Sequence, residues 1–282
     1  MKAWLVNNYF YNPRSFVEAT KRFVRAFRRH GVGYSVYTNA DCLAIPRDLP
    51  DFVLMRDKDM PLIESLERLG MPVYNDSSSI RLTDDKALTY VALKGIVPMP
   101  DTILCPYTYP NVGYVNVDFI DKVCDTLSMP MVVKATMGSF GEQVWLVRSR
   151  EELEGILART SAPLLFQRYI ESSHGRDMRL YVVGDEVVAA AVRESSDGDF
   201  RSNTALGGRM TPVKPSEEIC RIAVRATEAL GLSFGGVDVL LGDTPMLCEV
   251  NSNALFNSLE DATGTDVAGA IVRCCMDMTR AR

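Results

Sequence analysis

The chain has 282 residues, of which 47% are hydrophobic and 24% are charged, which is typical of globular proteins with room for two or three lobes. The net charge of −5 disfavours a polyanion, so no nucleic acid partner is expected. No apolar run reaches membrane-spanning length, no secretory signal is recognisable, and the seven cysteines contain no CxxC pair; together these features predict a cytoplasmic protein with no membrane partner.

The first 80 residues alternate between short apolar strands and helices. Strands are predicted at residues 3–6, 34–38, 51–57 and 72–75. The first helix has capping-box spacing at Ser15 and Glu18 and an apolar stripe behind it, and a second helix is expected near 60–69. Strand–helix alternation at this spacing predicts a parallel sheet with helices on both faces, and a first domain at residues 1–83.

The rest of the chain mixes helices with hairpins and is divided into segments 84–165 and 166–282. Helices are expected at 84–94, 118–127, 216–230 and 266–278, and another after the capping-box pair Ser149 and Glu152. Strands are expected at 98–104 and 163–170, around the loop within 130–147, and in a hairpin across Gly184-Asp185. The predicted class is therefore α/β throughout.

The stretch GGVDVLLGDTPMLCEVNSN, residues 235–253, reads as two apolar strands around a turn, yet outside the turn it carries the acids Asp238 and Glu249 and the amide Asn251. If the turn centres on Asp243 and Thr244, Asp238 lies opposite Glu249, and Asn251 shares their face. Facing carboxylates destabilise a hairpin unless a counter-charge is present. A divalent cation supplies that charge, and oxygen ligands favour Mg²⁺; the alternative is an exposed face with solvated acids.

Three further features are weak signals when taken alone. Lys134 ends an apolar strand and precedes a loop with Gly138, Ser139 and Gly141, where backbone N–H groups and a lysine could receive an anion. The alternative is a hairpin loop with an exposed lysine, and the order of the residues is not that of a Walker A loop.

Lys86, near the start of a helix, reads equally as a solvated surface lysine. The polar loop GDFRSN places Arg201 and Asn203 where an arginine could stabilise developing negative charge. The alternative is an ordinary surface loop.

The order of these motifs is more specific than any one of them. The series VVGDEVVAA, GDFRSN, GGVDVL and EVNSN, preceded by Lys86 and Lys134, resembles the ATP-grasp superfamily, and within it the RimK-like carboxylate–amine ligases of the alpha-L-glutamate type. The resemblance extends from about residue 84 to the end of the chain. It implies an ATP-grasp fold, and the first lobe looks like the pre-ATP-grasp domain of that superfamily.

The resemblance implies a role for each matching residue. Lys86 and Lys134 correspond to the lysines that contact ATP phosphates, and residues 138–143 correspond to the flap over them, including Gly138, Ser139 and Gly141. The remaining matches are the adenine-binding hinge (Gln167, Arg168, Tyr169 and Ile170), the acid beside the ribose (Asp177), the Arg-Ser-Asn group that meets the triphosphate and the acyl intermediate (Arg201, Ser202 and Asn203), and the metal ligands (Asp238, Glu249 and Asn251). Arg201 and Asn203 are the implied catalytic residues, and the implied cofactors are ATP and Mg²⁺, with Mn²⁺ as an alternative.

Two positions depart from the pattern of the family. Gln143 replaces the last glycine of the flap, and Arg168 stands where the hinge usually has an acidic residue. These differences concern the phosphate contact and the side-chain contact with the nucleotide.

The implied function is an ATP-dependent carboxylate–amine ligase that forms an amide bond through an acyl phosphate. Its expected partners are a carboxylate substrate and an amine substrate, with glutamate or another amino acid added to a peptide, a protein or a small molecule. Similar ligases commonly self-associate, but the sequence leaves the oligomeric state of this chain open. A kinase of the same fold, or a non-catalytic nucleotide-binding module, are the alternatives.

Overall fold

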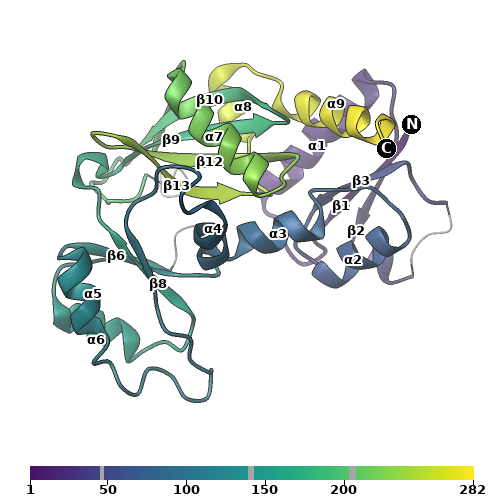
Figure 1. Ribbon diagram of the computed structural model, residues 1–282. Coiled ribbons are helices and arrows are strands. Elements are labelled where there is room, and N and C mark those ends of the chain that lie inside the picture. Colours follow the sequence, from purple (N-terminus) through teal and green to yellow (C-terminus); the bar gives the residue numbers. More distant parts are fainter. Residues whose placement is uncertain (45–47, 139–142, 203–207) are drawn as a thin grey trace.

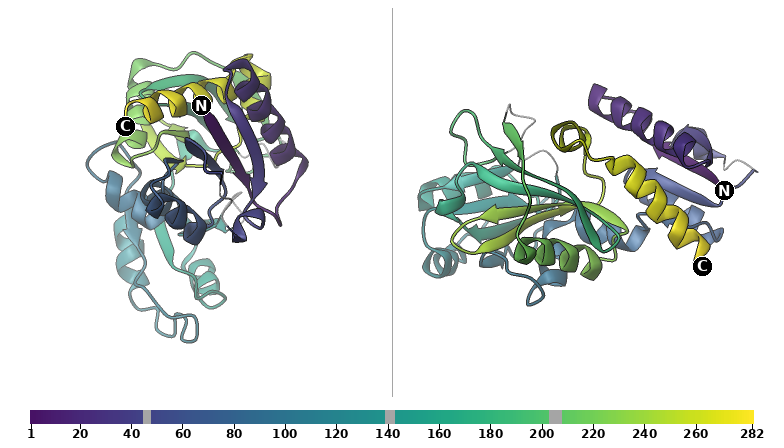
Figure 2. Two further views of the ribbon diagram at one scale, coloured as in Figure 1. Left: turned by 90° about the vertical axis from the view of Figure 1, so that its right-hand side faces the viewer. Right: turned by 90° about the horizontal axis from the view of Figure 1, so that it is seen from above.

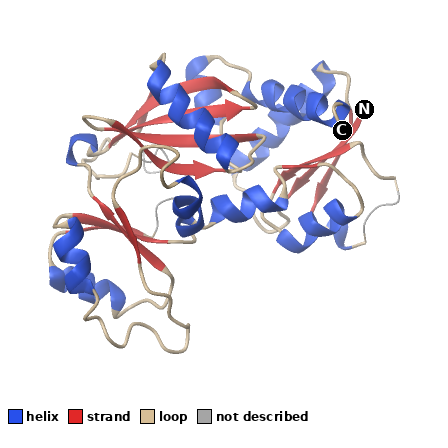
Figure 3. Cartoon of the chain, viewed as in Figure 1, coloured by secondary structure: helices blue, strands red, loops and turns tan. Residues whose placement is uncertain are grey.

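The structure is a computed structural model that describes residues 1–44, 48–138, 143–202 and 208–282. In these ranges the strands form three sheets, and helices pack against each of them (Figures 1 and 3). None of the helices in the same ranges is long and apolar enough to cross a membrane. The α/β class predicted from the sequence is confirmed.

The N-terminal sheet is parallel, with the strand order β2-β1-β3-β4. Its elements are β1 (Lys2–Asn7), α1 (Arg14–Arg29), β2 (Gly33–Thr38), the 3₁₀ turn η1 (Asp41–Leu43), β3 (Phe52–Arg56), α2 (Met60–Arg68), β4 (Val73–Tyr74) and α3 (Ser77–Asp84). Every residue of β3 is buried, because Phe52 and Leu54 pack with α1 and the side chains between them face α2. Burial on both faces explains why this strand reads as a continuous apolar run.

The central lobe contains an antiparallel sheet with the strand order β5-β8-β6-β7. Its elements are α4 (Lys86–Leu93), β5 (Thr102–Leu104), α5 (Ile120–Leu127), β6 (Met131–Ala135), β7 (Val144–Val147), α6 (Arg150–Leu157) and β8 (Leu164–Arg168). Met131, Val133 and Phe166 pack under α5 and α6. Since side chains alternate along a strand, Lys134 and Gln167 lie on the opposite face.

The third sheet is antiparallel, with the strand order β11-β10-β9-β12-β13. Its elements are the 3₁₀ turn η2 (Glu171–Ser173), β9 (Arg176–Val183), β10 (Glu186–Glu194), β11 (Arg209–Pro212), α7 (Glu217–Ala229), β12 (Phe234–Leu241), β13 (Pro245–Asn251), α8 (Asn257–Thr263) and α9 (Val267–Arg280). One face packs against α7 through Leu180, Val237 and Val250. The other face is apolar at one end only.

The last helix joins the N-terminal sheet to this third sheet. Helix α9 lies beside α1 although the two are at opposite ends of the sequence (Figure 2). One continuous core includes Leu5 and Phe27 of the N-terminal lobe, Tyr181 of β9 and Ile271 of α9. The N-terminal lobe therefore does not have a core of its own on this face.

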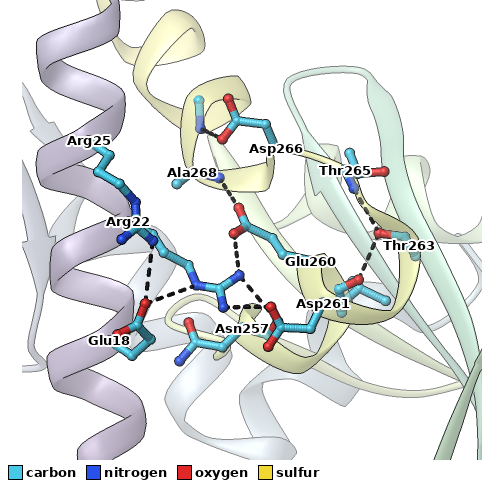
Figure 4. A network of polar contacts seen from close by, with 12 residues as sticks. Glu18, Arg22, Arg25, Asn257, Glu260, Asp261, Thr263, Thr265, Asp266 and Ala268 are labelled. Atoms are coloured by element: carbon cyan, nitrogen blue, oxygen red, sulfur yellow. Dashed lines mark hydrogen bonds and ion pairs between the residues drawn. The ribbon is translucent and has the colours of Figure 1, made fainter.

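A polar network reinforces the same seam (Figure 4). Arg22 of α1 donates hydrogen bonds to Glu260 (2.6 Å) and Asp261 (2.7 Å) of α8, and the side-chain amide of Asn257 donates to the backbone oxygen of Ser15 (2.6 Å). These contacts fix the start of α8 against the start of α1.

Of the two predicted helix caps, one differs from the structure and one agrees with it. Helix α1 begins before Ser15, at Arg14, and its cap residue Pro13 makes no side-chain cap, so the capping box at Ser15 is wrong. Proline at this point has the extended backbone that precedes a helix, and so it displaces the serine from the cap position. The cap at Ser149 is confirmed, because its side chain accepts a hydrogen bond from the Glu152 backbone N–H.

Candidate active site

The hairpin β12–β13 places Asp238 directly opposite Glu249, as predicted, but the register of the strands near the turn differs from the prediction. The turn is one residue longer than expected, since Leu241 rather than Gly242 faces Pro245. A bulge at Cys248 then shifts the register back. As a result Cys248 and Glu249 both line the cleft that the next paragraphs describe, while Leu247 and Val250 stay in the α7 core.

Asp238 is 4% exposed and is bound by two arginines. Arg179 donates to both carboxylate oxygens through Nε and Nη2, and Arg193 reaches Oδ2 at 2.9 Å. Arg193 also binds Asp177 with both Nε (2.8 Å) and Nη2 (2.6 Å). The sequence argument assumed that the hairpin acids lack a counter-charge; for Asp238 these guanidinium groups supply it.

The charges of this network set the protonation of its acids. Burial alone would raise the pKa of Asp238, but Arg179 and Arg193 together hold it below its ordinary value. Burial raises the pKa of Asp177, because Arg193 is shared with Asp238 and offsets the effect only in part. The same two carboxylates raise the pKa of Arg193, which therefore stays charged.

Glu249 has a more open environment than Asp238. Its side chain is 35% exposed, and the nearest cation is Lys86, whose Nζ lies 4.0 Å from Oε1. Lys86 begins α4, where Asp85 caps the helix, and its Nζ also donates to the backbone oxygen of Gly138 at 3.0 Å. The start of α4 thus links the base of the predicted flap to the hairpin acids.

Lys134 reaches the cleft from the central lobe. Its Nζ donates to Oε1 of Gln167 at 2.8 Å and lies 4.0 Å from the Cys248 sulfur. Burial raises the pKa of that thiol to about 11, so Cys248 is neutral. The two lysines therefore approach the hairpin from two different elements, α4 and β6.

The predicted hinge lies where β8 leaves the central sheet. Arg168 donates from its Nε to Asp101 (2.9 Å), so its side chain has an exposed acid partner. The Tyr169 hydroxyl contacts Nδ1 of His174. Ile170 lines the cleft and leads into η2.

Arg201 lies at the end of the polar loop and is held by Asp199 through Nε (3.0 Å) and Nη2 (2.8 Å). These hydrogen bonds hold the pKa of Asp199 below its ordinary value. Ser202 is buried and hydrogen-bonds to Asp177. The predicted site residues Ser139, Gly141 and Asn203 lie outside the described residues.

These side chains face one cleft of about 830 Å³, a size typical of ligand sites. The predicted residues that line it are Lys86, Lys134, Gln167, Arg168, Tyr169, Ile170, Asp177, Arg201, Ser202, Asp238, Glu249 and Asn251. Gly138 is not among them, although its backbone oxygen accepts from Lys86.

Several lining residues were not predicted. Arg179 and Arg193 were missed, although Arg179 lies two residues after Asp177 and so shares its face. The N-terminal lobe contributes Asn8 and Arg56, which follow apolar strands. The loop 252–255 closes this side, and Gly236 makes room for it: a Cβ at Gly236 would lie 2.4 Å from the Cβ of Ala254.

The donor set suits a hard divalent cation. Asp238, Glu249 and Asn251 offer only oxygen ligands and no sulfur or imidazole, as Mg²⁺ prefers. Three N–H groups occupy Asp238, and a carboxylate offers about four lone-pair sites, so one remains for a metal. In the described ranges no group of three or more His, Cys, Asp or Glu side chains forms a metal cluster, and the amide of Asn251 is thus needed to complete this set.

The cleft lies between the central sheet and the five-stranded sheet, and two lysines approach a pair of acids in it. This arrangement defines an ATP-grasp protein. The sequence matches the family model for the RimK-like ATP-grasp domain over residues 83–275. The chain belongs to this RimK-like ATP-grasp family.

Curated relatives support the same family. The chain is 35% identical over 242 residues to N-acetylaspartylglutamate synthase A of Homo sapiens, covering 81% of this chain and 60% of that protein. It is 36% identical over 231 residues to the probable alpha-L-glutamate ligase 2 of Shewanella amazonensis, covering 78% of this chain and 72% of that protein. The chain thus spans about three-fifths of the length of the human relative.

Solved structures share the fold across the whole chain. D-alanine–D-alanine ligase from Bacillus anthracis complexed with ATP superposes with a TM-score of 0.77 at 17% identity, covering 100% of this chain and 99% of that chain. The ATP-grasp ligase PsnB, complexed with a precursor variant, Mg and ADP, gives 0.71 at 17% identity, covering 98% of each chain. The predicted ATP-grasp fold is therefore confirmed.

Proposed function

We propose that the chain is an ATP-dependent carboxylate–amine ligase that forms an amide bond through an acyl phosphate. The observation that carries this proposal is the pairing of Asp238 with Glu249 across the hairpin. Glu249 lies beside Lys86, and both acids line the same cleft as Lys134. Each of these groups is suited to a polyphosphate or to the metal that accompanies it.

In the first step, an oxygen of the substrate carboxylate attacks the γ-phosphorus of ATP, and the bond to the β-phosphate oxygen breaks to release ADP. Lys86 and Lys134 offset phosphate charge, and Asp238, Glu249 and Asn251 would hold Mg²⁺, with Mn²⁺ as an alternative. When bound, the cation neutralises phosphate charge and aligns the transferred group. Gln167, Arg168, Tyr169 and Ile170 would hold the adenine, and Asp177 the ribose side.

In the second step, an amine attacks the acyl carbon, phosphate leaves, and a proton is lost from the amine nitrogen. Arg201, with Ser202 and Asn203, would stabilise the negative charge that develops on the carbonyl oxygen. The pair with Asp199 fixes the orientation of the Arg201 guanidinium. Gly138, Ser139 and Gly141 would form the flap that keeps water from the acyl phosphate.

The relatives indicate the kind of substrate. The names N-acetylaspartylglutamate synthase, beta-citrylglutamate synthase and alpha-L-glutamate ligase all contain glutamate. We therefore propose glutamate, or a similar amino acid, as the amine, and a small acid, a peptide or a protein tail as the carboxylate partner. A kinase would need no amine for product formation, and no contact in the cleft favours that alternative.

We also propose the domain division 1–83, 84–165 and 166–282, supported by the separate sheets, with β8 running across the second boundary. A cytoplasmic location is proposed as well, since all seven cysteines are free thiols.

The test is ADP release with Mg·ATP, glutamate and a panel of acids, with hydroxylamine added to trap an acyl phosphate as a hydroxamate. Glu249→Gln is the better variant for this test, because Asp238→Ala would leave the buried Arg193 and the partly buried Arg179 without their shared acid. Glu249→Gln is expected to reduce turnover by on the order of 100- to 1,000-fold, since a preorganised charge contact is lost.

The matched control is Glu194→Gln, which removes an exposed carboxylate that pairs with Arg176 and lies on β10 of the same sheet. It is expected to retain turnover. ADP formation without need of an amine, and with no hydroxamate, would favour the kinase; equal turnover in both variants would refute the metal-site assignment.

A further inference from the structure

Arg56 is a buried cation that has no acid partner among the described residues. It ends β3, lines the cleft and is only 5% exposed. No carboxylate forms an ion pair with it within the ranges that the structure describes, and Tyr181 is its only electrostatic neighbour of note. Burial lowers the pKa of Arg56 to about 10, so the group remains charged at neutral pH.

One side of the Arg56 guanidinium is fully engaged by the protein. Its Nη1 donates to Thr20 Oγ1 (3.0 Å) and to the backbone oxygen of Phe16 (3.2 Å), with Asn7 Oδ1 at 3.4 Å. The group also lies 5.2 and 5.5 Å from the ring centroids of Phe16 and Phe23. Stacking and these hydrogen bonds fix its orientation.

The other side of the group is available. In the described part of the chain, Nε and Nη2 of Arg56 have no hydrogen-bond acceptor. Arg179, Arg193 and Arg201 each use this same Nε/Nη2 edge to hold an aspartate. This edge matches a carboxylate in two parallel hydrogen bonds.

Neighbouring charges do not satisfy Arg56. The adjacent Asp57 accepts from the Asn8 amide (3.1 and 3.2 Å) and from the backbone N–H of Lys58 (2.7 Å). The Lys58 side chain is paired with Asp84. An anion from outside the protein therefore meets one uncompensated, oriented cation here.

The position suits the substrate rather than the nucleotide. Arg56 lies at the carboxyl end of a parallel strand, where open α/β sheets bind ligands. The loop 252–255 and Ser258, which belong to the other lobe, line the same cleft. The contacts of Arg22 with α8 (Figure 4) hold the two walls together. The hydrogen bond of Asn257 to Ser15 does the same.

We propose that Arg56 binds a substrate carboxylate that does not react, so that the substrate class includes a second, anchoring carboxylate. This inference rests on the ligase function proposed above. The anchoring group is either a further carboxylate of the acid or the carboxylate of the amino acid that supplies the amine, and kinetics on each substrate distinguish the two sources.

The kinetic test compares the wild-type protein with Arg56→Gln, measuring KM for the acid, for glutamate and for ATP. A hydrogen bond to a buried charge predicts a KM increase of about 10- to 100-fold for one of the two organic substrates, with KM for ATP changed less than about twofold. Arg56→Lys keeps the positive charge but lacks the paired Nε and Nη2 donors, so its KM is expected to lie between those of the wild type and Arg56→Gln. Arg25→Gln, on the exposed side of α1, is the matched control.

The binding test needs no turnover. Melting temperatures are measured without ATP in the presence of succinate, citrate or glutamate, and in the presence of the monoamide succinamate. If the acid supplies the anchoring carboxylate, succinate and citrate should stabilise the wild type and Arg25→Gln more than succinamate does. If the amino acid supplies it, glutamate alone should do so. In either case the difference from succinamate should vanish in Arg56→Gln.

The two tests separate this inference from the ligase function. Stabilisation that depends on Arg56, without ADP release for any acid, would refute the ligase and retain the carboxylate site. Equal melting shifts in wild type and Arg56→Gln, including no shift in either, would overturn the proposal. So would an equal rise in all three KM values.

Discussion

The two ends of one face of the five-stranded sheet differ in what holds them together. At one end Tyr181, Val183 and Ala189 pack against the N-terminal lobe and α9. At the other end of the same strands, Arg179 and Arg193 meet buried aspartates. Apolar burial stabilises the first end, whereas the second end is stable only while its charges remain paired.

Removing a charge from the polar end should have the largest effect on stability. Arg193→Leu leaves Asp177 without its partner and Asp238 with only Arg179, and we expect a loss of about 3–5 kcal/mol in the free energy of unfolding. Urea unfolding at neutral pH measures this loss.

The matched control is the next pair along the same strands. Arg176 faces Glu194 one position further along, and both side chains are about half exposed. Arg176→Leu should change the free energy of unfolding by less than about 1 kcal/mol. Similar losses in both variants would mean that burial does not distinguish the two pairs.

Overfilling the apolar end should have a smaller effect. Ala189 pairs with Tyr181 on the same face and is buried. Ala189→Leu should cost about 1–3 kcal/mol of stability, because the core must shift to admit the larger side chain. KM for ATP should stay unchanged; a raised KM at unchanged stability would show that the two ends are not separate.

Acid should weaken the polar end selectively, and this is the smallest effect. The lowered pKa of Asp238 means that its contribution is present above the unfolded-state value, near 4, and is lost as the pH falls through the folded-state value. The raised pKa of Asp177 acts in the opposite sense, so wild type should be compared with Asp238→Asn rather than followed alone. The stability difference between the two proteins should shrink below about pH 4; a constant difference would contradict the pairing.

The sequence predicts the elements of this molecule better than their registers. The alternation at the N-terminus was sufficient for the parallel sheet, because strands buried on both faces are apolar throughout. Helix α8 was missed: it is one short helix after the hairpin, with Phe256 before it and no side-chain cap.

The site residues that belong to sequence motifs were predicted, whereas residues whose position depends on a strand irregularity were missed. A regular count from the Gly184-Asp185 turn pairs Asp177 with Val192, but an irregularity between Val187 and Ala189 pairs it with Arg193 instead. Such shifts depend on tertiary packing and leave no local signal in the sequence. Arg56 was missed for a different reason, since its isolation becomes visible only when the surrounding acids are placed.

The shared core around α9 has a consequence for biosynthesis. The N-terminal lobe is synthesised before the helix that covers one face of its sheet, Val267–Arg280, because the second and third sheets lie between them in the sequence. Until that helix is made, Phe23, Phe27 and their neighbours lack part of their covering, so a nascent chain exposes apolar surface while the two later sheets are synthesised. The N-terminal lobe is thus completed only after those sheets, and chaperone capture would act on that lobe.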